Sequence, residues 1–85
     1  MIYFMVNKLT LIKRSNPICP NCIKMQDALD GEGISYDVID IAADTEAIDK
    51  YGIMSVPVIL IEDEDEVIRL NGLQPIEVVI EFLED

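Results

Sequence analysis

A segment with helical spacing lies between two segments with strand spacing, and this order restricts the fold more than any other feature of the 85 residues. Residues 8–13 (KLTLIK) and 34–41 (ISYDVIDI) place apolar side chains at alternate positions, which predicts two strands. Between them runs an apolar stripe with the spacing of a helix, made of Ile18, Cys22, Met25 and Leu29. Two strands joined by a helix pair in parallel, with a right-handed crossover.

The second half of the chain predicts a short helix, a hairpin and a last helix. The expected segments are a helix over 45–52, a buried strand over 56–61, an acidic turn over 62–66, a strand over 66–70 and a helix over 76–83. Asp44 or Thr45 can cap the short helix, and Gly52 ends it. Pro75 suits the start of the last helix. The order β-α-β-α-β-β-α predicts an α/β fold, with a four-stranded mixed sheet flanked by helices.

Composition is consistent with one domain over residues 1–85, in which residues 1–6 are a candidate extension of the first strand. Half of the residues are apolar (51%), which is enough for one hydrophobic core without stabilising cross-links. The formal net charge of −11 argues against nucleic acid and anionic membranes as partners, and it favours solubility or a partner with a basic face. Residues 1–13 lack the basic start and the cleavage site of an export signal, so we expect a cytosolic protein. We also expect the protein to be a monomer.

Cys19 and Cys22 are the only cysteines of the chain, which has no histidine. Dithiol redox chemistry, a structural disulfide and metal binding all use this spacing. The loop that a disulfide would close here is too short to restrain the unfolded chain much. A structural zinc site needs four ligands, which only a site shared between two chains could supply, and a copper carrier would hold the pair in an exposed loop. Redox chemistry is the favoured interpretation, and a metal-binding module is the remote alternative.

The expected helix gives the two thiols different roles. Cys19 falls at its N-cap with Pro20 at the first helical position, where unpaired N–H groups and the helix dipole favour a thiolate. Cys22 lies one turn further on, facing the core. We therefore expect Cys19 to attack a substrate disulfide and Cys22 to resolve the mixed disulfide that forms.

Pro57 opens the most apolar strand segment, and together with the Cys-Pro-Asn-Cys motif it resembles the thioredoxin superfamily over nearly the whole chain. Residues 15–22 (SNPICPNC) are similar to glutaredoxins and residues 50–61 (KYGIMSVPVILI) to thioredoxins. The resemblance implies a thioredoxin fold, a cis peptide bond before Pro57, and a substrate site formed by Pro20, Val56 and Pro57. In that site the backbone of Val56 would pair with an incoming substrate strand.

The chain also departs from both groups. Three glutathione contacts of glutaredoxins are altered, at Asn16, Asn21 and residues 71–74 (NGLQ). Ile18 replaces the tryptophan that precedes the first cysteine of thioredoxins, and Lys13 has the spacing of their buried acid. The proton acceptor for Cys22 is therefore unassigned, with water as one candidate.

The resemblance and its departures together predict a thiol–disulfide oxidoreductase with no bound cofactor and no metal. It would reduce disulfide-containing protein substrates, and an NADPH-dependent flavoprotein reductase of the thioredoxin type would reduce it in turn. Ribonucleotide reductase is a candidate client. In the alternative, a glutathione-dependent glutaredoxin, Lys13 and Arg14 would supply part of a rebuilt glutathione site.

Overall fold

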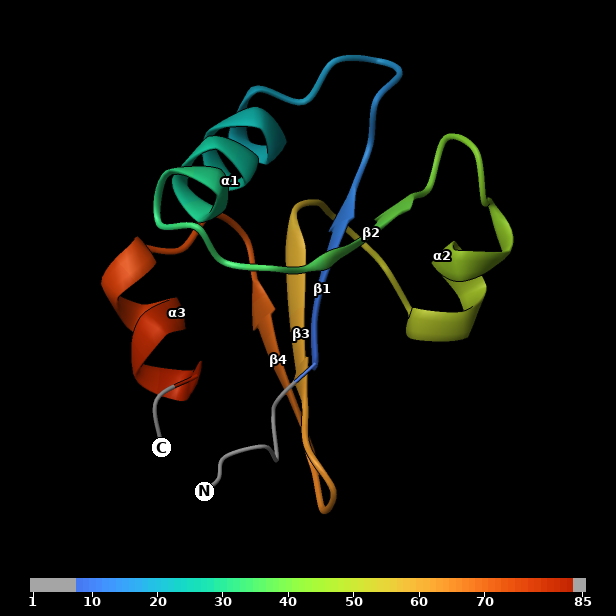
Figure 1. Ribbon diagram of the computed structural model, residues 1–85. Helices are drawn as coiled ribbons and strands as arrows, with labels where there is room; N and C mark the ends of the chain where they lie inside the picture. The colour runs from blue at the N-terminus through green and yellow to red at the C-terminus, as the bar shows by residue number, and fades with distance from the viewer. Residues whose placement is uncertain (1–7, 84–85) are drawn as a thin grey trace.

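The computed structural model of the chain describes residues 8–83 (Figure 1). The elements are β1 (Lys8–Lys13), α1 (Pro20–Gly31), β2 (Asp37–Asp40), α2 (Glu46–Tyr51), β3 (Val58–Glu62), β4 (Val67–Asn71) and α3 (Ile76–Leu83). Every predicted element is present, and the predicted order is confirmed. The candidate extension of the first strand over residues 1–6 lies outside the described residues.

One mixed sheet holds the strands in the order β2-β1-β3-β4. β1 pairs in parallel with β2, as expected for strands joined by α1, and β3 is antiparallel to both β1 and β4. Ile12, near the end of β1, pairs with Val58 at the start of β3. The loop that leaves β1 and the loop that enters β3 therefore lie at the same end of the sheet, the upper end in Figure 1.

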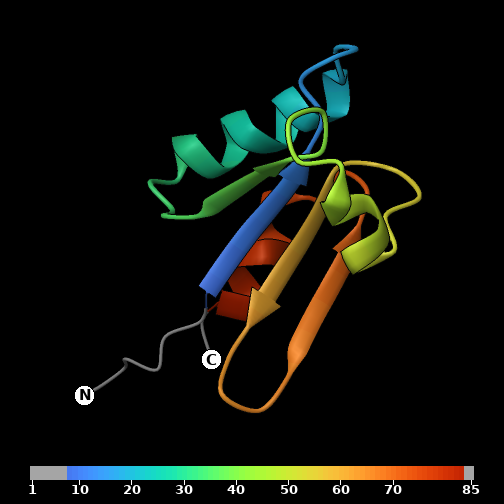
Figure 2. The ribbon, with the colours of Figure 1, turned by 90° about the vertical axis from the view of Figure 1, so that its right-hand side faces the viewer.

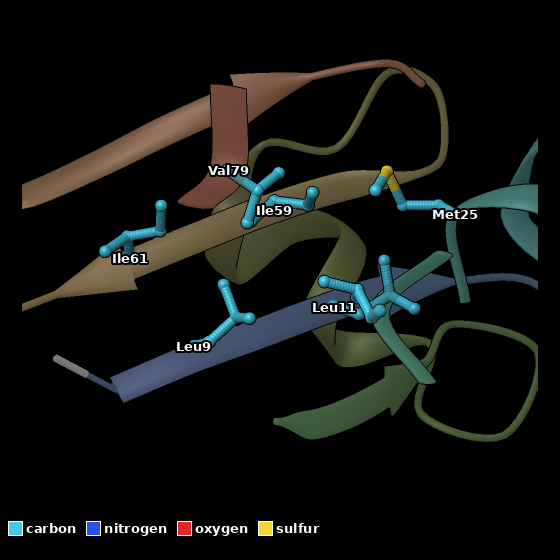
Figure 3. Packing of buried hydrophobic residues seen from close by; sticks show 7 residues of the cluster. Leu9, Leu11, Met25, Ile59, Ile61 and Val79 are labelled. Carbon is cyan, nitrogen blue, oxygen red and sulfur yellow. The ribbon is translucent and has the colours of Figure 1, made fainter. Parts of the chain in front are cut away.

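The larger core lies between the sheet and the helices α1 and α3, which cover one face (Figures 1 and 3). Side chains alternate across a strand, so Leu9 and Leu11 of β1 enter this core while Ile12 faces the other way. The buried members are Leu9, Leu11, Met25, Leu29, Ile59, Ile61 and Val79. Cys22, Met25 and Leu29 are the buried residues of α1, which confirms this part of the predicted stripe.

α2 covers the opposite face and stands in front of the sheet in Figure 2. A smaller buried cluster lies beneath it, made of Ile12, Ile53, Val58 and Leu60. β1 and β3 thus carry buried side chains on both faces, as the β-branched run at 56–61 predicted for its strand.

Two details of the prediction are wrong. Ile18 does not belong to the buried stripe, because it precedes the N-cap of α1, where helical spacing no longer applies, and it is 71% exposed. The second strand is shorter than residues 34–41, since the Ile34 N–H donates to the Leu29 carbonyl and so closes the end of α1. Gly33, with a φ of 69°, makes this reversal of the chain.

Candidate active site

Cys19 and Cys22 form a disulfide at the start of α1, with their Cα atoms 5.2 Å apart. Cys19 is the N-cap, with extended backbone, and Pro20 follows at the start of the helix, as predicted. The Cys22 N–H donates to Cys19 Sγ at 3.1 Å. One of the N–H groups that a helix start leaves without a backbone partner is therefore directed at the first sulfur.

Exposure hardly distinguishes the two cysteines in this oxidised form. Cys19 is 5% exposed and Cys22 2%. The difference lies in their surroundings: Cys19 Sγ accepts the hydrogen bond at the helix start, whereas Cys22 belongs to the buried face of α1.

The loop that precedes Cys19 is hydrogen-bonded to Asp40, the last residue of β2. Asp40 Oδ1 accepts the backbone N–H of Ser15 at 3.1 Å and that of Ala42 at 3.0 Å. Hydrogen bonding to the Ser15 side chain and then to the Ala42 N–H, partly opposed by desolvation, lowers the pKa of Asp40 below its ordinary value. Within the loop, Arg14 Nε donates to the Pro17 carbonyl at 3.0 Å. Sequence reasoning missed Asp40, whose only signal was a carboxylate at the end of a predicted strand.

Pro57 lies at the same end of the sheet, and its peptide bond with Val56 is cis, as the resemblance implied. Pro57 is buried, and its carbonyl accepts the Gly72 N–H at 2.8 Å. Val56 is half-buried, and within residues 8–83 its backbone N–H and C=O make no hydrogen bond. Both groups are therefore available to an extended peptide.

The loop between β4 and α3 connects these two parts of the site. Its Gly72 N–H binds Pro57, and its Gln74 N–H contacts Met25 Sδ of α1 at 3.5 Å. Leu73 between them is 41% exposed. Together with Ile18 (71% exposed) and Met54 (94%), it gives three of the loops at this end of the sheet an exposed apolar side chain.

The side chain of Lys13 contacts α1 one helical turn beyond the second cysteine. Lys13 Nζ donates to Gln26 Oε1 at 3.3 Å, and Gln26 is one helical turn beyond Cys22. Asn16 and Asn21, at the altered glutathione positions, are exposed. Between residues 8 and 83, histidine, cysteine and carboxylate side chains form no group of three suited to a metal ion. No helix in that range is long and apolar enough to cross a bilayer.

Comparisons with known proteins agree with this geometry. Residues 10–83 match the family described as "Thioredoxin domain". The SPbeta prophage-derived thioredoxin-like protein YosR of Bacillus subtilis (strain 168) is 33% identical over 69 residues, which cover 79% of this chain and 86% of that protein.

Solved structures share the fold at lower identity. Chloroplastic thioredoxin z superposes with a TM-score of 0.80 at 17% identity, over 93% of this chain and 76% of its own. The glutaredoxin-like protein NrdH-redoxin from Escherichia coli superposes with a TM-score of 0.63 at 21% identity, over 92% of this chain and 96% of its own. The expected thioredoxin fold is confirmed.

Proposed function

This chain belongs to the thioredoxin domain family and is a thiol–disulfide oxidoreductase, and from that premise we propose that it reduces protein disulfides and is itself reduced by an NADPH-dependent flavoprotein reductase. The proposal assigns distinct roles to the two cysteines and to the loop around Val56. It places the reaction in the cytosol, where reducing systems keep thiols reduced.

The reaction begins with reduced Cys19 as a thiolate. It attacks one sulfur of the client disulfide; an S–S bond forms between Cys19 and that sulfur, and the other client sulfur leaves as a thiolate that takes a proton. Cys22, after losing its proton, then attacks Cys19 Sγ and expels the second client sulfur, which is protonated in turn. Two electrons pass to the client, and the Cys19–Cys22 disulfide is the oxidised product.

The hydrogen bond from the Cys22 N–H to Cys19 Sγ carries this assignment. The same donor at the helix start stabilises negative charge on Cys19 in the reduced protein and favours it as the attacking sulfur. Within residues 8–83 no such donor reaches the sulfur of Cys22, which lies on the buried side of α1. This asymmetry supports Cys19 as the nucleophile and Cys22 as the resolving thiol.

The substrate site comprises Pro20, Val56 and Pro57. The backbone groups of Val56, which make no hydrogen bond within residues 8–83, pair with an extended client segment beside the disulfide. Pro20 is exposed next to Cys19, and buried Pro57 fixes the end of the Val56 loop. The exposed side chains of Ile18, Met54 and Leu73 supply apolar contact around that segment.

A flavoprotein reductase is the proposed electron donor because this chain lacks the residues with which glutaredoxins contact glutathione. The altered positions are Asn16, Asn21 and residues 71–74. The similar structure of NrdH-redoxin is described as a glutaredoxin-like protein with a thioredoxin-like activity profile, which supports the same choice. Ribonucleotide reductase is the candidate client carried over from the resemblance.

Consumption of NADPH with insulin as the disulfide acceptor tests the proposal. One arm is coupled through a thioredoxin reductase and the other through glutathione and glutathione reductase, with Cys19→Ser as the inactive control. We expect turnover in the first arm only. Turnover in the glutathione arm alone would replace the proposed donor by glutathione, and turnover that survives Cys19→Ser would remove the assigned nucleophile.

A further inference from the structure

The loop over residues 52–57 carries Met54 and Val56. Its first residue contacts the edge strand β4, and its last residue contacts Gly72, the residue that follows β4. At its far end the Pro57 carbonyl accepts the Gly72 N–H at 2.8 Å. At its near end the guanidinium of Arg69 contacts the carbonyls of Tyr51, the last residue of α2, and of Gly52, the C-cap. Figure 2 shows α2 against the upper part of β3 and β4.

Arg69 makes three hydrogen bonds with separate nitrogens. Nη1 donates to the Tyr51 carbonyl, Nη2 to the Gly52 carbonyl at 3.1 Å, and Nε to Asn71 Oδ1 at 3.0 Å. Carbonyl groups at a helix end have no helical partner and carry the negative end of the dipole. A guanidinium is suited to this position because its donors are held in a fixed fork.

Between these attachments the loop has a buried residue, Ile53, followed by an exposed tip formed by Met54 and Ser55. Ile53 is 8% exposed, and its N–H donates to the Ile48 carbonyl at 2.9 Å. The next residue, Met54, is 94% exposed, and Ser55 is exposed too. The position of this tip relative to Cys19 therefore depends on where the end of α2 is held.

We infer that Arg69 is a positioning residue for client binding: it holds the end of α2 on β4 and so places Met54 and the backbone of Val56 for the client segment. The inference rests on the proposed function, since it concerns how a protein disulfide docks. Arg69 itself need not touch the client or the sulfurs. Its loss should weaken docking of a protein substrate and leave the chemistry of Cys19 intact.

The test compares Arg69→Met, which keeps an unbranched side chain but no donor, with Lys8→Met, which removes one positive charge from the start of β1. For Arg69→Met we expect KM for insulin to rise about five- to tenfold, as loss of one ordinary hydrogen bond at an exposed site implies, with kcat and the rate toward the small disulfide hydroxyethyl disulfide within about twofold. Arg69→Lys, which keeps the charge and loses the fork, should fall between wild type and Arg69→Met. Lys8→Met should match wild type.

A second measurement does not depend on turnover. Hydrogen exchange of the Ile53 amide, whose N–H donates to the Ile48 carbonyl, should become about tenfold faster in Arg69→Met, because the end of α2 opens more often, and should stay unchanged in Lys8→Met. Unchanged exchange and unchanged KM would overturn the inference, as would an equal loss of rate toward insulin and the small disulfide. If wild type reduces no protein disulfide, the proposed function fails, while exchange still reports whether Arg69 holds the loop.

Discussion

The residues of the candidate site could be predicted from the sequence because their signals are local. Cys19, Pro20 and Cys22 belong to one short motif at a helix start, and Pro57 directly precedes an apolar strand. Asp40 and Arg69 were missed for a physical reason. Each acts on backbone groups far away in the sequence, Ser15 for Asp40 and Tyr51 with Gly52 for Arg69. Such contacts exist only after the sheet has formed.

Asp40 gives a prediction about pH. Its pKa is lowered in the folded protein, first by hydrogen bonding to Ser15, so its contribution to stability is present above the carboxyl pKa of the unfolded chain, about 4. That contribution is lost as pH falls through the lower folded pKa. The stability difference between wild type and Asp40→Asn should therefore be largest near neutral pH and shrink below about pH 4.

Urea unfolding of both proteins at a series of pH values measures this difference. Asp65→Asn, a charge removal in the β3–β4 turn, is the matched control. A difference between wild type and Asp40→Asn that stays constant down to the acid end of the series would contradict the assigned role of the carboxylate.

At the scale of elements, hydrophobic periodicity predicted each helix and strand, and its errors occurred where an element begins or ends. Ile18 fitted the helical spacing of Met25 and Leu29 but lies before the N-cap. Residues 34–36 fitted the alternation of a strand, yet the Ile34 N–H closes α1 instead of joining the sheet. Periodicity reports which face a side chain takes within an element, whereas backbone hydrogen bonds decide where that element stops.

Met25 supports a prediction about how the elements pack. It is fully buried in the core that α1 and α3 share with the sheet, and its sulfur contacts the Gln74 N–H. Met25→Ala should lower the free energy of unfolding by about 2–5 kcal/mol because it leaves a cavity. Met25→Leu keeps the volume and should lower it by less than about 1.5 kcal/mol. Denaturant unfolding measures both values, and equal losses would show that volume at this site is not what stabilises the packing.

For the whole molecule, charge is the dominant global property. The chain carries 17 acidic and 6 basic residues, so the folded state is opposed by repulsion between like charges. Added salt screens that repulsion, with a Debye length of about 10 Å at 0.1 M. We expect the melting temperature to rise as sodium chloride increases from about 0.01 to about 0.2 M. Calorimetry over this range tests the expectation, and a melting temperature that falls would indicate that attractive ion pairs outweigh the repulsion.

The charges are also unevenly distributed along the fold. Residues 62–66 are all acidic and comprise the last residue of β3 and the β3–β4 turn, at the lower end in Figure 1. Residues 13–26, which carry the disulfide at the upper end, contain Lys13, Arg14 and Lys24 and no acid. On a cationic support such as an anion-exchange resin, the molecule should therefore adsorb through its hairpin and keep its cysteines toward the solution, so that the immobilised protein remains open to its clients.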